Sequence, residues 1–163
     1  ELTADHGLSP VQAETAVSMI FWGMAIGSVG AGVLSDLWQH RKWFVVSNAL
    51  LAAIAYGLAI LVETESVWFI SLMLFLGGLF GGAQMLTFAM AKEGHPSDIS
   101  GTIIAFVNMV GIGGALIFQP LVGYLIDMSG GNFQFAMTTM PACLIVSALL
   151  GLFVSEERHA DHV

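Results

Sequence analysis

The stretch Ser9–Lys42, SPVQAETAVSMIFWGMAIGSVGAGVLSDLWQHRK, decides the fold of this chain. Ser9 can cap a helix, Pro10 suits the first helical position, and Gln12 completes a capping box three residues after the cap. The residues then stay largely apolar as far as Leu37. At about 1.5 Å per residue, such a helix is longer than the roughly 30 Å hydrocarbon core of a bilayer requires. The stretch therefore predicts a membrane-spanning helix that is tilted or extends beyond the membrane.

Four further apolar stretches follow, each long enough to cross a bilayer and none alternating with a period of two residues. A bilayer core admits only helices or closed barrels. The predicted spans cover about residues 10–37, 43–62, 67–91, 100–126 and 133–154, and a polar tail follows at 155–163. Because the breaks between them are short, neighbouring spans must be antiparallel. The predicted fold class is all-α, a polytopic membrane protein with five transmembrane helices.

The composition agrees with a lipid environment. Apolar residues make up 56% of the chain and charged residues only 10%, whereas a soluble domain needs roughly a quarter of its residues charged. The net charge is −8, and most carboxylates lie in the breaks and tails. With four Lys and Arg in total, the chain has no basic stripe for nucleic acid. The expected partner at its surface is therefore the lipid bilayer.

The basic residues predict the orientation, because cytoplasmic loops carry the excess of Lys and Arg. Arg41 and Lys42 lie in the first break, Lys92 in the third and Arg158 in the tail. In a chain of alternating spans, all four fall on the same side. We therefore expect the N-terminus outside and the C-terminus in the cytoplasm.

The first span carries small residues at every fourth position. Gly23, Gly27, Ala31 and Ser35 form a ridge along one face. Such ridges let the backbone of another helix approach closely within a membrane. The pattern predicts close packing rather than contact with a ligand.

The end of this span predicts a charge clasp at the membrane surface. Gly32 and Ser35 precede the carboxylate Asp36, and the basic pair Arg41 and Lys42 follows the break. Asp36 can pair with Arg41, with Lys42 or with the N-terminus of a neighbouring helix, whose dipole favours anions. Such a clasp can hold the cytoplasmic end shut and break when the helices rock.

This segment resembles the loop motif of the major facilitator superfamily, Gly-x-Leu-Ala/Ser-Asp followed by basic residues, found after the second and again after the eighth helix. The matching positions are Gly32, Leu34, Ser35, Asp36, Arg41 and Lys42. Leu37, Gln39 and His40 depart from the motif, which resembles the weaker copy in the second half of the family.

The resemblance covers the whole chain and implies that its spans correspond to helices eight to twelve. The third span lacks the arginine typical of the fourth helix in many members, and the fourth span, with Gly113-Gly114 and Gln119-Pro120, is similar to the eleventh helix of bacterial organic-solute permeases. The implied architecture is a C-terminal half bundle that lacks its first helix. The implied partner is the missing N-terminal half, and the implied location is a bacterial inner membrane.

Polar side chains within spans are costly, so they are candidate substrate contacts. Asn108 and Gln119 are eleven residues apart, which at about 100° per residue brings them to nearly the same helix face. Hydrogen bonding between helices explains this pair as well as substrate contact does. Gln84 shares a face with Gly81 and Phe80. The resemblance assigns their span to helix ten, which usually lines the transport cavity.

Glu14 lies one turn into the first span near the expected outer surface, and Ser18 and Trp22 follow it at intervals of four. It is a candidate protonation site or outer gate, and the alternative is a solvated carboxylate that suits a helix N-terminus. Trp22 is a further candidate substrate contact. The histidines show no metal-ligand spacing, and no motif of an enzyme active site is present, so we expect no metal, no cofactor and no enzymatic activity.

The function that these features favour is secondary active transport of a small polar solute by alternating access, with this chain as the second half of the transporter. Proton coupling follows only from the resemblance. A second hypothesis is a nontransporting membrane scaffold or assembly subunit whose glycine faces bind partner helices.

Overall fold

The computed structural model describes residues 8–38, 40–93 and 95–154, and their regular elements are helices. The elements are α2 (Pro10–Trp38), α3 (Arg41–Leu61), α4 (Val67–Gly81), η1 (Gly82–Gln84), α5 (Met85–Lys92), η2 (Ser97–Ile99), α6 (Ser100–Met128), α7 (Phe133–Met137) and α8 (Thr139–Gly151). Among the described residues, five helical runs are long and apolar enough to cross a membrane. The predicted tail at 155–163, with Arg158, lies outside the described residues.

Side-chain caps fix where several helices begin. The Ser9 backbone N–H donates to Gln12 Oε1 at 2.9 Å, and the Gln12 N–H donates to Ser9 Oγ at 3.3 Å, so the predicted capping box is present. Ser66 and Asn132 cap α4 and α7 by accepting from backbone N–H groups three residues on. These caps place the helix starts in the polar breaks.

Two of the predicted spans are interrupted along their length. The third continues from α4 to α5 through the single 3₁₀ turn of η1, which directly follows Gly81. The fifth breaks at Thr138, between α7 and α8. Pro141 explains this second break, because it has no N–H to donate to the carbonyl of Met137 and its ring crowds that carbonyl.

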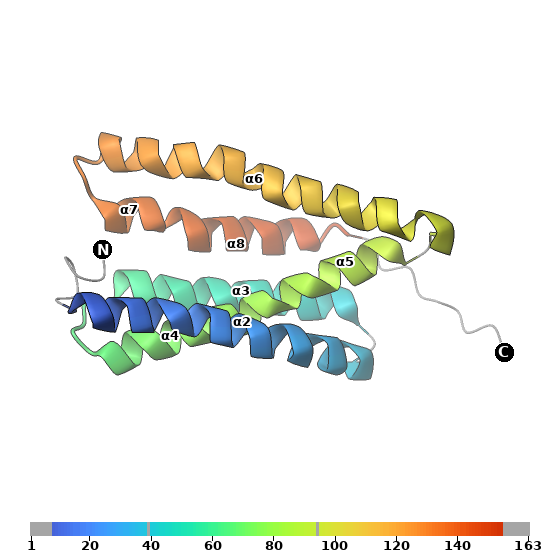
Figure 1. Cartoon of the computed structure of the whole chain (residues 1–163), viewed down its shortest axis with the longest axis horizontal. Coiled ribbons are helices and arrows are strands. Elements are labelled where there is room, and N and C mark those ends of the chain that lie inside the picture. Colours follow the sequence, from blue (N-terminus) through green and yellow to red (C-terminus); the bar gives the residue numbers. More distant parts are fainter. Residues whose placement is uncertain (1–7, 39, 94, 155–163) are drawn as a thin grey trace.

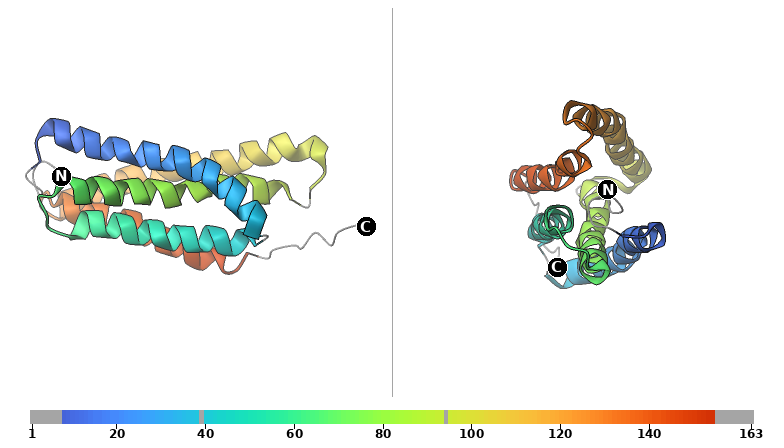
Figure 2. Two further views of the ribbon diagram at one scale, coloured as in Figure 1. Left: turned by 90° about the horizontal axis from the view of Figure 1, so that it is seen from below. Right: turned by 90° about the vertical axis from the view of Figure 1, so that its left-hand side faces the viewer.

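The helices lie side by side along one axis (Figures 1 and 2). In the end-on view, α4 lies between α2 and α3 (Figure 2). The α3 helix also packs along α8, whereas α6 meets the rest of the described chain mainly through α5, η2 and α7, close to its two ends. The molecule therefore has a tightly packed part, α2 to α4, and a loosely attached helix, α6.

The tightest interface joins α2 to α4. A Cβ atom at Gly23 or Gly27 would collide with the backbone of α4 at Phe75 or Leu79. In the reverse direction, a Cβ at Gly78 would collide with the α2 backbone at Ile20. Ala31 and Ser35 continue the ridge and are also buried. The predicted close approach of two helices is thus present, with α4 as the partner.

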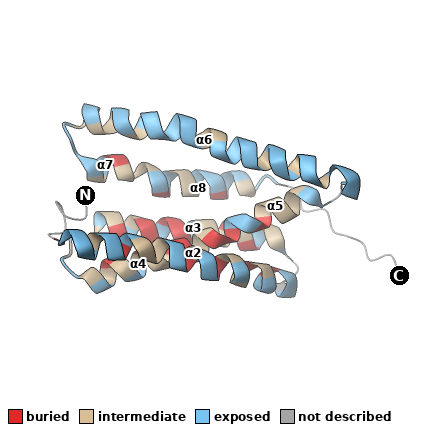
Figure 3. Ribbon diagram, in the orientation of Figure 1, coloured by how far each residue is buried: buried red, intermediate tan, exposed pale blue. Residues whose placement is uncertain are grey.

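Buried side chains gather around this interface and along α3 (Figure 3). One cluster centres on Ile70 with Ala16, Ala52 and Tyr56, and a smaller one joins Phe44 to residues of α2, η1 and α5. In contrast, no residue of α6 is buried. Its 29 residues present apolar side chains all round, as expected of a helix that faces lipid on at least one side.

Candidate functional site

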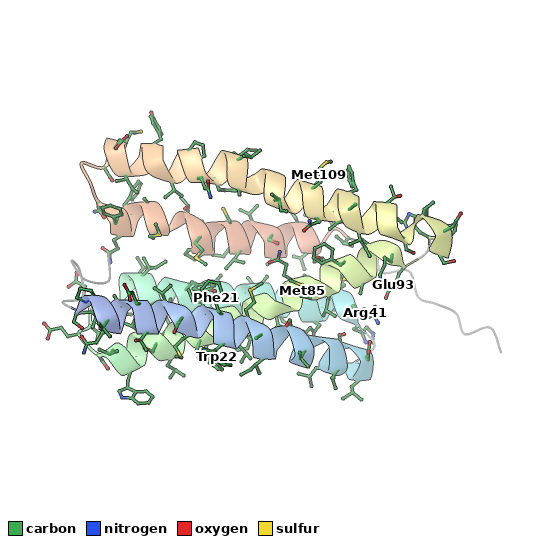
Figure 4. The ribbon with its side chains drawn as sticks, viewed as in Figure 1. Phe21, Trp22, Arg41, Met85, Glu93 and Met109 are labelled. Atoms are coloured by element: carbon green, nitrogen blue, oxygen red, sulfur yellow. The ribbon has the colours of Figure 1, made fainter. Side chains whose placement is uncertain are left out.

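One guanidinium joins three helices at one end of the molecule. Arg41 Nη2 lies 2.8 Å from Asp36 Oδ1 at the end of α2. Its Nη1 pairs with Glu93 Oε1, just after α5. Arg41 and Glu93 are seen together near the right-hand end of Figure 4. Arginine suits this position because its fork of N–H donors can serve two separate carboxylates. We call Arg41, Asp36 and Glu93 the clasp.

The clasp contains the Asp36–Arg41 pair that the sequence suggested, and it adds Glu93. The sequence analysis missed Glu93 because it lies 52 residues from Arg41. The one available signal was its position at the end of the third span, on the same side as the basic pair. Arg41 keeps 29% of its side-chain exposure, Glu93 39% and Asp36 66%, so solvent screens both ion pairs.

The other predicted latch residues have different surroundings. Lys42 Nζ donates to the backbone oxygen of Leu152, after α8, at 2.7 Å. Ser35 is fully buried, and its hydroxyl donates to the Gly32 carbonyl within α2 at 3.0 Å. A Cβ at Gly32 would meet nothing within 4 Å. Ser35 therefore contributes packing near the clasp, and Lys42 connects α3 to α8.

A cavity of about 400 Å³ lies between the helices. Its wall includes Met24 of α2, Tyr56 of α3, Gly81 and Gln84 of the third span, Phe118 of α6 and Cys143 of α8. No Asp, Glu, Lys, Arg or His side chain lines it. The cavity can therefore take an uncharged group, with hydrogen bonds from one amide and a few hydroxyl or thiol groups.

Gln84 is the predicted substrate contact that the structure places in the cavity wall, at the last position of η1. Phe80 is half-buried and packs against the cluster around Ile70. Asn108 and Gln119 are exposed on α6, within about a quarter turn of the cavity-lining Phe118. The structure thus brings Gln84 to the cavity, whereas the side-chain amides of Asn108 and Gln119 lie beside the part of α6 that lines it.

Two predicted residues lie away from this cavity. Trp22 is 63% exposed on α2, and Figure 4 shows it next to Phe21, which is also largely exposed. Glu14 is exposed one turn into α2. Tyr56 and Cys143 are cavity residues that the sequence does not single out, because nothing in their local sequence distinguishes a cavity wall from a helix contact. Among the described residues, no group of three or more His, Cys, Asp or Glu could hold a metal ion.

Comparison with known proteins identifies the family. The model of the Major Facilitator Superfamily matches residues 1–163. The chain is 24% identical to the putative metabolite transport protein YncC of Bacillus subtilis, over 88% of this chain and 31% of that protein. It is 27% identical to the magnetosome protein MamH of Paramagnetospirillum magneticum, over 90% of this chain and 36% of that protein.

A third relative is the niacin transporter NiaP of Acinetobacter baylyi, which is 24% identical over 88% of this chain and 32% of its own length. The chain thus spans about a third of the length of these curated relatives. No solved structure gives a significant match. The family consists of transporters rather than enzymes. With its five membrane-spanning helices and a family match along its full length, this chain is an integral membrane protein of the Major Facilitator Superfamily.

Proposed function

We propose that this chain forms the C-terminal half of a secondary transporter that moves a small polar solute by alternating access. The observation that carries the proposal is the family match over the whole chain, together with relatives named for transport of metabolites and niacin. The missing N-terminal half would be the partner against which this half rocks. A bacterial inner membrane is the proposed location, since the three relatives described above are bacterial.

The clasp gives this proposal a mechanism at the cytoplasmic end. Exposed ion pairs contribute only about 0.2–1 kcal/mol each, so they can break and form again within a transport cycle. Asp36, Arg41 and Glu93 come from the ends of three different elements, so breaking the pairs removes the charged contacts that α2 and the end of α5 make with the start of α3. The buried cluster around Phe44 also joins these elements. In this proposal, the closed clasp corresponds to a closed cytoplasmic side.

Gln84, Asn108 and Gln119 are the proposed polar contacts to the solute, with Phe80 as an aromatic neighbour. Trp22 lies away from the cavity and is left out of the proposed site. Gln84 already lies in the cavity wall, and the α6 amides would complete the site across from it. Because the cavity wall has no charged side chain, an ionic solute would need its counter-charge from outside this chain.

Uptake by the full-length protein in proteoliposomes tests these contacts. For a confirmed substrate, Gln84→Ala and Asn108→Ala should each raise KM about 2-fold to 10-fold, the loss of one hydrogen bond of roughly 0.5–1.5 kcal/mol. Trp68→Phe is the matched control, since Trp68 is 87% exposed on α4. Unchanged KM and kcat in both alanine variants would remove these residues from the site.

Proton coupling is also part of the proposal, with Glu14 as the candidate protonation site of this chain. Glu14 is exposed one turn into α2, so it can exchange protons with the outer solution. If it couples transport, Glu14→Gln should abolish the pH dependence of uptake, whereas Glu65→Gln in the α3–α4 connection should retain it. A pH dependence that survives Glu14→Gln would exclude Glu14 as the coupling site.

The scaffold hypothesis remains the alternative function. The ridge with Gly23 and Gly27 is already covered by α4, whereas a Cβ at Gly111, Gly113 or Gly114 of α6 would meet nothing within 4 Å. We propose transport rather than a scaffold because relatives of the chain are named for transport.

A further inference from the structure

A side chain from the start of α3 caps the end of α8. Lys42 Nζ donates to the Leu152 backbone oxygen at 2.7 Å, across 110 residues of sequence. The α8 helix ends at Gly151, and the last carbonyls of a helix have no partner inside it. A cation at this end also interacts favourably with the helix dipole. Lys42 thus ties α3 to α8 at the end of the molecule that holds the clasp.

The opposite end of the same helix pair repeats the arrangement with the roles exchanged. Gln134 Nε2, in the first turn of α7, donates to the Ile60 backbone oxygen at 2.8 Å. The α3 helix ends at Leu61, so Ile60 also carries one of the carbonyls without a helical partner. The α3 helix therefore caps the C-terminal end of α8, and α7, which precedes α8 in the same span, caps the C-terminal end of α3.

Between the two caps, α3 and α8 pack closely. Val46 and Ala148 are buried, at 6% and 3% exposure, and Pro141 is buried as well. A Cβ added at Gly151 would lie only 2.8 Å from Val46 Cγ2. The small residues let the two backbones approach, as in other membrane helix pairs.

The α6 helix is attached in a different way. It has no buried residue, and it meets the described chain mainly through α5, η2 and α7. The α5 helix is held more firmly, because Leu86 is buried in the cluster with Phe44 at the start of α3. Among the described helices, α6 is therefore the one with the least packing to keep it against α3 and α8.

We propose that Lys42 and Gln134 are positioning residues that lock α3 to α7 and α8 at both ends, so that these three helices move as one rigid unit. The rigidity of this unit during a transport cycle rests on the proposed transport function, whereas the lock itself does not.

Distance measurements test the lock in the full-length protein. Spin labels at Leu50→Cys and Leu150→Cys, on exposed positions of α3 and α8 and in a Cys143→Ser background, should give a narrow distance distribution. Lys42→Met should broaden it, and adding Gln134→Leu should broaden it further. Lys42→Arg should restore the narrow distribution, because a guanidinium can donate to the same carbonyl.

Lys92→Met is the matched control, since it removes the same charge from the end of α5. It should leave the α3–α8 distribution narrow. A distribution in Lys42→Met with Gln134→Leu that is as narrow as in the wild type would overturn the lock.

A crosslink tests the rigid unit during transport. Cysteines in place of Val46 and Gly151 suit a disulfide, because a Cβ at Gly151 already lies close to the Val46 side chain. Uptake should be the same with this disulfide oxidised or reduced. Loss of uptake on oxidation that is recovered on reduction would overturn the rigid unit.

Discussion

At the residue scale, Arg41 shows why the type of basic residue matters. The spacing of Asp36 and Arg41 in the sequence was enough to suggest their pairing, because five residues around a short break keep both at one membrane surface. The pairing with Glu93 depends on the third span ending beside the first break. A planar guanidinium can satisfy both carboxylates, whereas an ammonium is a compact point charge that favours one at a time.

Arg41→Lys should therefore weaken the closed cytoplasmic side without changing the net charge. Losing one exposed ion pair of roughly 0.2–1 kcal/mol should raise the open fraction of a two-state equilibrium about 1.5-fold to 5-fold. The measurement is the rate at which a thiol reagent modifies a single cysteine placed at Asp98, in a Cys143→Ser background. Glu63→Gln, in the connection at the other end, should leave that rate unchanged, and an unchanged rate in Arg41→Lys would contradict the role of the clasp.

At the element scale, the α2–α4 interface depends on which glycines touch a neighbour. Gly27 and Gly30 lie three residues apart in the same helix, yet a Cβ at Gly27 would collide with Leu79 and a Cβ at Gly30 would meet nothing within 4 Å. The four-residue spacing of the ridge predicted the contact face. The helix that covers this face could not be predicted, because every span of the chain is apolar enough to be a partner.

These two glycines offer a matched pair of substitutions. Gly27→Ala should destabilise the protein by about 1–3 kcal/mol, because the added methyl group forces the two backbones apart. Gly30→Ala should be neutral or stabilise by up to about 1 kcal/mol, since alanine is the better helix former. Thermal unfolding of the full-length protein in detergent measures both, and equal effects from the two variants would contradict the interface.

A second lesson at this scale concerns the two prolines in the later spans. Pro120 lies inside α6 without ending it, whereas the fifth span breaks at Thr138, three residues before Pro141. Both prolines are visible in the sequence. A proline leaves one backbone carbonyl of the preceding turn without its N–H donor. Whether the helix continues through the proline depends on whether groups of neighbouring helices can satisfy that carbonyl.

At the scale of the whole molecule, the expected orientation of the chain in the membrane rests on where its charges lie. Arg41, Lys42 and Lys92 lie at the ends of helices that meet at one end of the molecule, the end with the clasp. The connection between α3 and α4, with Glu63 and Glu65, lies at the other end. Since positive residues are retained in the cytoplasm, we expect the clasp to face inward.

Labelling with a membrane-impermeant maleimide checks this orientation in intact cells. In a Cys143→Ser background, Glu63→Cys should be labelled from outside, and Asp98→Cys should be labelled only after the membrane is opened. Both positions are exposed in the structure, so access alone does not distinguish them. The reverse pattern of labelling would show that the proposed orientation is wrong.

The sequence by itself determined the features that depend on neighbouring residues. Helix-length apolar runs set the number of spans, the capping box set the start of α2, and the spacing of Gly23 and Gly27 set a packing face. The physical reason is that the bilayer acts on each segment separately and requires its backbone to be paired within the helix.

Only the tertiary structure decided which segments meet. It brought Glu93 to Arg41, Gln134 to the end of α3, and Tyr56 with Gln84 to one cavity, across sequence separations of tens of residues. Lipid is as apolar as the helix surfaces, so burial of apolar area does not select among partners. Close fit of small residues and a few hydrogen bonds make that choice, and both depend on all the helices together.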